Sequence, residues 1–248
     1  MICSGFEEPE AGRCEADGRI TREGLRDGSE LAVARARALP HVPIRSDEEI
    51  AASLQATLAE RGEKSDVWVF GYGSLIWNPT IEYAETRPAL LPGWHRRFCL
   101  SSNGRGSPER PGVMLALDSG GNCWGAAFRL EEHQVEEELF ILWRREMLSG
   151  SYHARWLTAE IEGASVPVLA FVANRNHPSF TDELDEEEIA ERIAFARGPL
   201  GSCLEYLRNT MAGLDALGLQ DDGLERVRLK VEAKLNAGSP AEMTYSSG

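Results

Sequence analysis

The sequence predicts an α+β protein in which a small, mostly antiparallel β-barrel is flanked by helices. The first observation is a β-rich stretch, residues 67–130, where short runs of Val, Trp, Phe and Leu alternate with Gly and Pro clusters. The second is the helical periodicity before this stretch and at the end of the chain. Strands followed by helices are typical of the α+β class, and a mainly antiparallel sheet can close into a barrel.

A capping box begins the first helix, because Glu49 stands three residues after Ser46. Ile50, Leu54 and Leu58 form one apolar stripe on that helix. The other elements follow in order along the chain. Strands are expected at 67–70, 87–91, 96–100, 113–118 and 123–129, a helix at 131–147, strands at 154–161 and 166–173, and helices at 185–196, 203–213 and 224–235.

The chain divides into one domain and two terminal segments. Residues 1–45 are rich in Gly, Glu and Arg and show little periodicity, which predicts a flexible N-terminal extension. Residues 46–236 form a single domain that begins with the helix at 46–61. Residues 237–248 are expected to be a flexible tail.

Composition excludes several classes of function. The net charge of −14 disfavours nucleic acid and anionic membranes as partners, because phosphate contacts need clustered Lys and Arg. No apolar run approaches the roughly 18 residues of a membrane span, and the N-terminus lacks the pattern of a secretory signal. The 5 cysteines are widely spread and indicate free thiols in a reducing cytoplasm. The histidines lack metal-ligand spacing, so no metal site is expected.

The segment 67–74 is a strand that runs into the turn Gly71-Tyr72-Gly73-Ser74. Two glycines separated by one residue allow a sharp bend and a close approach of the backbone to another group. The amides of such a turn can hold an anion or an oxyanion. The alternative is a tight turn without chemistry, since the third glycine of a dinucleotide site and the lysine of a phosphate loop are missing. Ser74 is also a candidate nucleophile, although it lacks the Gly-x-Ser-x-Gly pattern.

One carboxylate falls on the apolar stripe of the helix at 131–147. Val135, Leu139 and Leu142 stand at i, i+4 and i+7, and Glu146 follows at i+11. A carboxylate that faces the core is costly unless it is paired or neutral. Burial raises its pKa, as a general base working near neutral pH requires. The alternative is a structural ion pair with a neighbouring or barrel arginine.

Several motifs in a fixed order resemble the ChaC family of γ-glutamylcyclotransferases, of the glutathione-specific type. The resemblance covers about residues 67–235. It rests on Val69-Phe70-Gly71-Tyr72-Gly73-Ser74-Leu75-Ile76-Trp77, Arg96-Arg97-Phe98, Arg105-Gly106 with Pro111-Gly112, Trp124-Gly125 with Arg129-Leu130, Arg145-Glu146 with Gly150 and Tyr152, and Gly198-Pro199 with Gly201, Glu205, Tyr206 and Leu207.

The resemblance implies a γ-glutamylcyclotransferase-like barrel and a cytoplasmic lyase that needs no cofactor or metal. The implied substrate is glutathione, whose α-amine attacks its own γ-carbonyl to give 5-oxoproline and cysteinylglycine. Glu146 is the implied catalytic acid and base. Tyr206 is implied to line the pocket, with helix packing as the alternative role. The implied substrate-binding loop consists of Val69, Phe70, Gly71, Tyr72, Gly73, Ser74 and Leu75.

Two other functions remain open from the sequence: action on other γ-glutamyl peptides or amines, and a non-catalytic binding or regulatory role. Glu137 matches a second glutamate of some family members, but nine residues on a continuous helix place it half a turn from Glu146. The family often has Gly-Pro-Ser-Gly-x-Asn where this chain has the segment 198–203 with Leu200 and Cys203. This departure changes the contacts expected around Tyr206.

Overall fold

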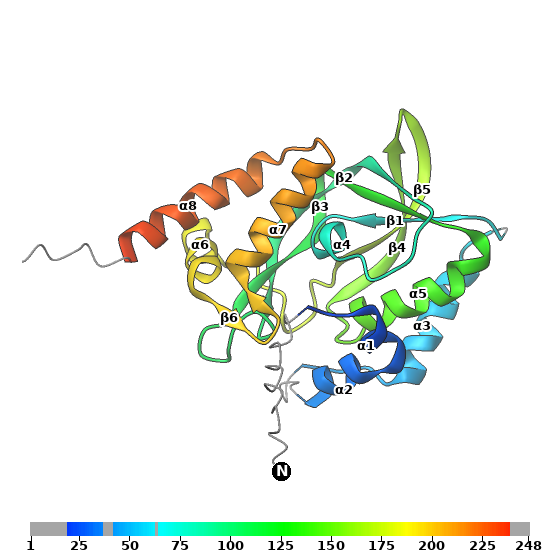
Figure 1. Cartoon of the computed structure of the whole chain (residues 1–248), viewed down its shortest axis with the longest axis horizontal. Helices are drawn as coiled ribbons and strands as arrows, with labels where there is room; N and C mark the ends of the chain where they lie inside the picture. Colours follow the sequence, from blue (N-terminus) through cyan, green and yellow to red (C-terminus); the bar gives the residue numbers. More distant parts are fainter. Residues whose placement is uncertain (1–18, 37–41, 63, 239–248) are drawn as a thin grey trace, which may run out of the picture.

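The computed structural model describes residues 19–36, 42–62 and 64–238, and the chain forms a barrel with helices on two sides (Figure 1). The elements, in chain order, are α1 (Arg22–Asp27), α2 (Ser29–Ala36), α3 (Asp47–Ala59), β1 (Val67–Gly71), α4 (Ser74–Trp77), β2 (Glu85–Ser102), β3 (Gly112–Leu130), the 3₁₀ turn η1 (Glu132–Gln134), α5 (Val135–Glu146), β4 (Tyr152–Ile161), β5 (Ala164–Ala173), α6 (Glu186–Phe195), β6 (Arg197–Gly198), β7 (Gly201–Ser202), α7 (Cys203–Ala216) and α8 (Asp222–Gly238).

The barrel is closed, with strand order β1-β3-β2-β4-β5. The pairs β1–β3, β2–β3, β2–β4 and β4–β5 are antiparallel. A short parallel pairing of β1 with β5 completes the circle. The predicted fold class, a mostly antiparallel barrel with flanking helices, is therefore confirmed.

Two strands are longer than the sequence predicted. The strands expected at 87–91 and 96–100 are one strand, β2, and those at 113–118 and 123–129 are likewise one strand, β3. Pro92 faces Asn122 and Trp94 faces Ser119, with a register shift between them. Glycines in this region allow a bulge, which bends both strands while their pairing continues. The prediction that one strand ends here and a separate strand begins was wrong.

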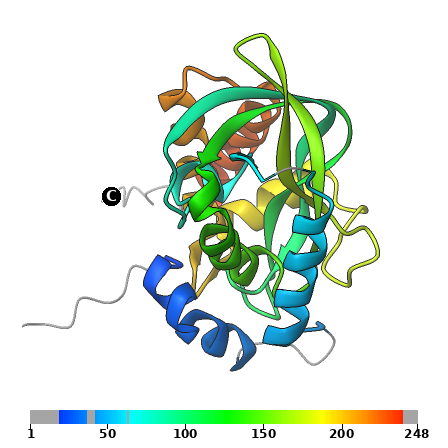
Figure 2. The ribbon, with the colours of Figure 1, turned by 90° about the vertical axis from the view of Figure 1, so that its right-hand side faces the viewer.

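The helices form two groups on opposite sides of the barrel, α1, α2, α3 and α5 on one side and α6, α7 and α8 on the other (Figures 1 and 2). β1 lies between them. Val67 and Val69 pack in the apolar cluster that includes α5, whereas Phe70 and Tyr72 pack in the cluster that includes α7. Burial on both faces explains why this strand is apolar at nearly every position.

The capping box predicted for the helix at 46–61 is present, with the Ser46 and Glu49 side chains each bonding the other's backbone amide. The N-terminal extension is different from the prediction over part of its length. Residues 22–36 form two helices, and Leu25 and Leu31 are buried in the core cluster. For these residues the expected flexible extension was wrong, because single apolar side chains in short helices leave little periodic signal. Residues 1–18, 37–41 and 239–248 of the predicted terminal segments lie outside the described residues.

An ion pair attaches α1 to α5. Arg22 Nη2 donates to Glu138 Oε1 at 2.7 Å, and the Glu82 amide donates to Glu138 Oε2 at 2.8 Å. The Glu138 side chain is 3% exposed and that of Arg22 is 20% exposed. The pair therefore compensates a carboxylate that burial would otherwise make costly.

We expect Arg22→Met to lower the free energy of unfolding by about 2–3 kcal/mol. This lies below the range for fully buried pairs because Arg22 keeps some contact with water. Urea unfolding measures the loss. The control is Arg26→Met, which breaks the exposed pair with Glu137 and should change stability by less than about 0.5 kcal/mol. Equal stability losses in the two variants would contradict this account.

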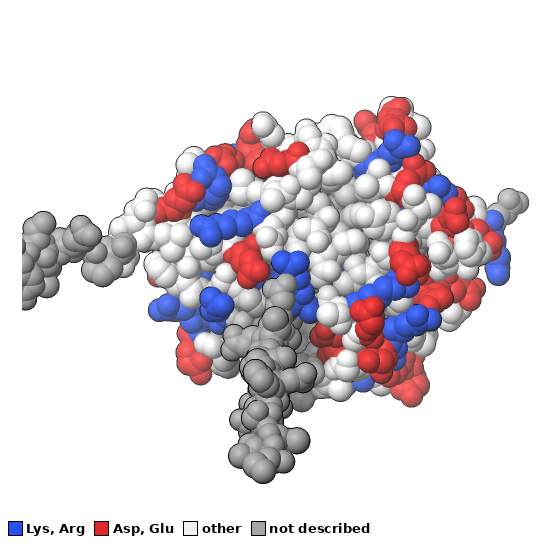
Figure 3. Space-filling model, in the orientation of Figure 1, with Lys and Arg blue, Asp and Glu red and all other residues white. Residues whose placement is uncertain are grey.

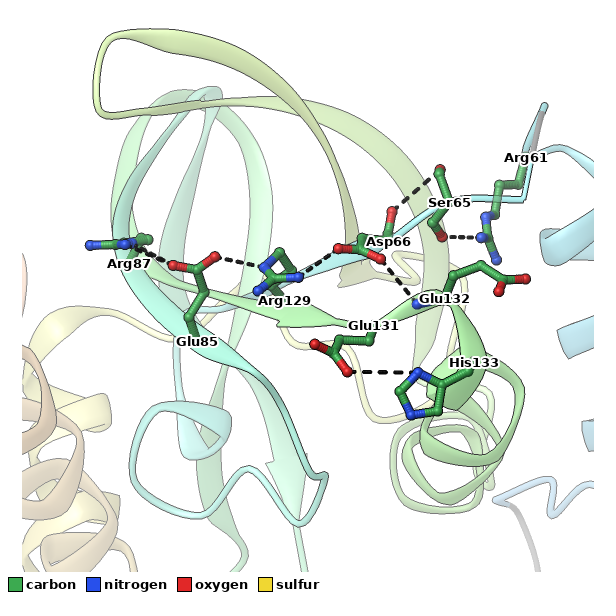
Figure 4. A network of polar contacts seen from close by, with 9 residues as sticks. All are labelled: Arg61, Ser65, Asp66, Glu85, Arg87, Arg129, Glu131, Glu132 and His133. Carbon is green, nitrogen blue, oxygen red and sulfur yellow. Dashed lines mark hydrogen bonds and ion pairs between the residues drawn. The ribbon is translucent and has the colours of Figure 1, made fainter.

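A second polar network lies at the start of β1, at the end opposite Gly71 (Figure 4). Arg129 lies between two carboxylates, with its Nε 2.6 Å from Glu85 Oε1 and its Nη1 2.6 Å from Asp66 Oδ2. The Glu132 amide donates to the other Asp66 oxygen at 3.0 Å. Exposed pairs of this kind contribute little stability, but they link β2, β3 and η1 to the entry of β1.

Basic and acidic side chains are interspersed over the face shown in Figure 3 rather than gathered in one patch. A mixed distribution of this kind is typical of a solvated surface. Among the helices of the described residues, none combines the length and the hydropathy needed to cross a membrane.

Candidate active site

The turn that follows β1 leads directly into the four-residue helix α4. The Ile76 amide donates to the Gly73 carbonyl at 3.0 Å, and the Asn78 amide donates to the Ser74 carbonyl at 2.9 Å. The amides of Ser74 and Leu75 lie in the first turn, where a helix offers them no internal acceptor. These amides are suited to holding a negatively charged oxygen.

Position 73 must be a glycine because Tyr206 of α7 lies directly against it. A Cβ atom placed on Gly73 would lie 2.7 Å from the Tyr206 hydroxyl oxygen, closer than real side chains approach. Tyr206 is buried, and its ring packs edge-on against Trp77 and Phe98. Tyr206 therefore has the packing role considered for it, and its hydroxyl also lies against the turn.

Glu146 is the last residue of α5, and its side chain is 12% exposed. Its carboxylate lies in a narrow recess of about 20 Å³ that includes the turn. The recess is lined by Tyr72, Gly73, Ser74, Leu75, Leu115, Glu146, Tyr152, Phe171 and Tyr206. Glu146 therefore shares one cavity with Ser74 and Leu75, the residues whose amides lie in the first turn of α4.

Two opposing effects act on the Glu146 carboxyl. Burial raises its pKa above the usual value, and the charge and hydrogen bond of Arg145 lower it in part. Arg145 Nε lies 2.9 Å from Glu146 Oε1, while Oε2 has no hydrogen-bond partner among the described residues. The ion pair considered as an alternative from the sequence is therefore present, and it leaves one carboxylate oxygen available to a substrate.

Arg145 also holds the turn in place. Its Nη2 donates to Ser74 Oγ at 2.8 Å, and its Nη1 donates to the Asn78 carbonyl and to Thr80 Oγ1. The Arg145 side chain is only 4% exposed. One guanidinium therefore fixes the position of Glu146 relative to α4.

Three buried phenols surround the recess. The Tyr72 hydroxyl donates to the Phe171 carbonyl at 2.7 Å, and the Tyr152 hydroxyl lies 3.4 Å from the Leu115 carbonyl. Burial raises the pKa of all three phenols, those of Tyr72, Tyr152 and Tyr206. They are therefore neutral near pH 7.

The recess adjoins a larger chamber of about 580 Å³. Ser74, Glu146 and Tyr152 line both cavities, and Arg145 lines the chamber alone. The chamber continues past them to a polar wall and to a wall formed by the N-terminal segment. The polar wall includes Ser101, Ser102, Asn103 and Arg105. The wall formed by the N-terminal segment includes Ile20, Ala34 and Ile44.

The structure brings together most of the site residues expected from the sequence. Tyr72, Gly73, Ser74, Leu75, Glu146 and Tyr206 all line the recess. Val69, Phe70 and Gly71 line neither cavity. Val69 and Phe70 are fully buried in the two core clusters, and a Cβ on Gly71 would meet the Phe128 ring at 2.9 Å. Packing of the strand occupies the side-chain positions of these three residues, and their contact with the substrate stays a prediction.

Glu137 lies away from the site. Its side chain is 56% exposed and pairs with Arg26 at 2.9 Å. This agrees with the half-turn offset from Glu146, because α5 is continuous from Val135. Leu115, Tyr152 and Phe171 of the recess were not proposed as site residues from the sequence. They come from three strands, and Leu115 and Phe171 lie too far from Glu146 in the sequence for a local spacing to connect them. No cluster of metal-ligating side chains occurs within the described residues.

Comparison with known proteins finds one matching family and several relatives with the same described activity. The profile of the family described as "ChaC-like protein" matches residues 67–234. The glutathione-specific γ-glutamylcyclotransferase of Escherichia coli is 44% identical over 197 residues, which is 79% of this chain and 85% of the relative. The human glutathione-specific γ-glutamylcyclotransferase 1 is 33% identical over 193 residues, 75% of this chain and 87% of that protein.

The fold also matches a solved structure. A glutathione-specific γ-glutamylcyclotransferase from yeast aligns with a TM-score of 0.62 over 68% of this chain and 96% of that one, at 21% sequence identity. That likeness concerns the fold alone. Because the family profile covers most of the barrel and α5 to α8, and the Escherichia coli relative aligns over most of its own length, the chain belongs to the ChaC-like protein family.

Proposed function

We propose that this protein is a glutathione-specific γ-glutamylcyclotransferase, which converts glutathione into 5-oxoproline and cysteinylglycine. One observation carries the proposal: Glu146 lines the same recess as Ser74 and Leu75, whose amides lie in the first turn of α4. The printed activity of the Escherichia coli and human relatives supports the same reaction for this chain.

The first step is attack of the substrate's α-amine on its own γ-carbonyl. The amine is mostly protonated near pH 7, so a base must remove a proton first. Glu146 is placed for this, because it lines the recess and its pKa is raised by burial, and because Arg145 contacts only Oε1. Enclosure holds the amine and carbonyl in a five-membered geometry. The Ser74 and Leu75 amides donate to the oxygen that becomes negative.

The second step breaks the amide bond to cysteine. The tetrahedral carbon expels the cysteine nitrogen while the γ-carbonyl re-forms, which leaves 5-oxoproline. Glu146 gives its proton to the leaving nitrogen, and the regenerated carboxylate then takes the second proton from the attacking nitrogen and passes it to the released amine. Over the whole reaction two protons leave the attacking nitrogen and two reach the leaving nitrogen. The reaction is therefore an internal exchange of one C–N bond for another, with no water consumed.

The chamber can receive the rest of the substrate. Its volume of about 580 Å³ lies within the usual range of about 300–1,000 Å³ for small-molecule sites. The polar wall near Ser101–Arg105 offers hydroxyl, amide and guanidinium groups beyond the recess. This polar continuation supports a peptide substrate in preference to a γ-glutamyl amine with an apolar leaving group.

The decisive experiment incubates purified protein separately with glutathione and with γ-glutamyl-alanine, and measures both products of each reaction. Release of cysteinylglycine and 5-oxoproline in equal amounts supports the proposal. Preference for γ-glutamyl-alanine would instead assign a cyclotransferase of broader type. Binding of glutathione without product would favour a non-catalytic role.

We expect Ser74→Ala to retain most of the activity. Ser74 Oγ accepts a hydrogen bond from Arg145, but the internal displacement requires no acyl-enzyme. The loss should be less than about tenfold in kcat/KM, because the lost hydrogen bond is made to Arg145 and not to the reacting atoms of the transition state. Steady-state assays on glutathione test this. Complete inactivation, with the fold intact, would mean that Ser74 is a nucleophile.

The cytoplasm is the proposed location. Three cysteines within the described residues, Cys99, Cys123 and Cys203, are free and buried. Free thiols of this kind are common where the environment is reducing, and glutathione is abundant under the same conditions.

A further inference from the structure

A second cavity, of about 250 Å³, adjoins the substrate chamber and has no role in the mechanism above. We call it the side cavity. Side chains of α1 and α2 form one part of its wall, and Leu148, Pro199 and Leu200 form another. Leu148 and Leu200 also line the chamber. The side cavity therefore lies directly beside the space proposed for the substrate.

The lining of the side cavity is mainly apolar. It includes Ile20, Leu25, Leu31, Val33, Ala34 and Leu200. Two charged side chains that reach it are bonded to neighbouring backbone. Glu30 Oε1 accepts from the Thr21 amide at 3.0 Å, and Arg144 Nη1 donates to the Leu25 carbonyl at 2.7 Å. The side cavity therefore suits a hydrocarbon group better than a charged or strongly polar one.

The N-terminal part of this wall is fixed by contacts with the rest of the protein. Asn78 Nδ2 donates to the Ile20 carbonyl at 3.1 Å, and the Asn78 carbonyl accepts from Arg145. Leu25 and Leu31 are buried in the core cluster. A ligand that enters the side cavity therefore loses little affinity to the ordering of its wall.

The side cavity begins close to the bond that breaks. Leu148 stands two residues after Glu146 and lines both the chamber and the side cavity. In glutathione the cysteine follows the breaking amide bond directly, so its side chain is the first group beyond the reacting carbonyl. A thiol fills little of a space of about 250 Å³. With the peptide backbone against the polar wall of the chamber, the sulfur is the atom from which a further group can extend into the side cavity.

We propose that the side cavity binds an apolar substituent on the sulfur of glutathione, so that the protein also cleaves S-alkyl conjugates of glutathione. The inference rests on the proposed function, because the same γ-glutamyl group reacts in both substrates. The α-amine forms a C–N bond with the γ-carbonyl carbon, and the C–N bond to cysteine breaks. Two protons pass from the attacking to the leaving nitrogen, and the carbon–sulfur bond is unchanged. The products are 5-oxoproline and S-alkylcysteinylglycine.

The test first measures binding without turnover, by isothermal titration of the Glu146→Gln variant. The two ligands are S-methylglutathione and S-hexylglutathione, which differ only in the length of the alkyl chain. We expect the hexyl conjugate to bind more than about tenfold more tightly, because each methylene taken out of water contributes about fourfold. Val33→Asp in the same variant should remove most of this preference. Val33 lines the side cavity and not the chamber, and a carboxylate there disfavours an alkyl chain.

The matched control is Ala32→Asp, which adds the same charge to the same helix. Ala32 is exposed and lines neither the chamber nor the side cavity, so the preference for the hexyl conjugate should remain. The second measurement uses the wild-type protein. It should release 5-oxoproline and S-hexylcysteinylglycine in equal amounts from S-hexylglutathione.

Equal binding of the two conjugates by Glu146→Gln would overturn the proposal, and so would an equal loss of preference in Val33→Asp and Ala32→Asp. Conversion of glutathione but not of S-hexylglutathione would overturn the activity on conjugates. Preferential binding of the hexyl conjugate, with no product from either it or glutathione, would overturn the proposed function and support the side cavity as a binding site.

Discussion

Glu146→Gln is expected to lower 5-oxoproline formation by at least about 10²-fold, the scale of general base catalysis, while the protein remains folded. Glutamine has nearly the same volume, and its amide oxygen can still accept from Arg145 Nε. It cannot take a proton from the substrate amine. Turnover of glutathione, measured by product release with circular dichroism as the check on folding, tests this expectation.

The matched control is Glu137→Gln, on the same helix. Glu137 is exposed and pairs with Arg26 away from the recess, so its neutralisation should leave kcat/KM unchanged. Substantial activity in Glu146→Gln, or inactivation by Glu137→Gln, would remove Glu146 from the mechanism.

The pH dependence follows from the state in which Glu146 acts. As a base it must be ionised, so kcat/KM falls as the pH drops through its pKa. Burial raises that pKa, which moves the acidic limb of the profile above the usual range for a glutamate. The same shift makes the ionised form of Glu146 unfavourable for folding above this pKa. The acid therefore reduces stability at neutral pH, as is common for groups kept for catalysis.

The local parts of this site could be predicted from the sequence. Val135, Leu139 and Leu142 are buried on the expected stripe of α5, and the carboxylate that follows them reaches the recess. The glycines of the turn were recognised as a close approach of the backbone, and Tyr206 is the group that approaches Gly73. Periodicity and turn chemistry act over a few residues, and these features lie within that range.

Features that depend on contacts between distant segments could not be predicted in this way. Arg105 stacks on Tyr206, about a hundred residues further along the chain, and no spacing rule connects them. Arg22 pairs with Glu138 across a similar separation, so α1 showed no signal of its docking on α5. The strands β2 and β3 continue through glycines that resemble turn signals, because the two strands pair with each other on both sides of the bulge.

The two interpretations of Glu146 from the sequence, structural ion pair or catalytic base, prove compatible. Arg145 lies against one carboxylate oxygen and keeps the buried charge tolerable. The other oxygen has no hydrogen-bond partner among the described residues, and Glu146 lines the recess. Arg145 thus keeps the pKa of Glu146 at an intermediate level. Without Arg145 the carboxyl would be neutral over a wider range of pH, and with a second cation its pKa would be too low for a base.

Arg145→Met is the variant that separates these contributions. We expect the free energy of unfolding to fall by about 3–5 kcal/mol, because Glu146 loses its buried partner and Ser74 loses its hydrogen bond. The pKa of Glu146 should rise, since Arg145 is the group that lowers it. The acidic limb of kcat/KM should therefore move to higher pH, with part of the activity recovered in alkaline buffer.

Arg144→Met provides the comparison for this pH shift. Arg144 donates to the Leu25 and Arg26 carbonyls outside the recess, so its loss should reduce stability without moving the acidic limb. Urea unfolding and pH–rate profiles of both variants measure the two effects. An unshifted limb in Arg145→Met would show that Arg145 does not tune Glu146. A shift of the same size in Arg144→Met would assign the change to general loosening of α5. A shift confined to Arg145→Met requires direct contact with the Glu146 carboxylate, because the two arginines are neighbours on the same helix.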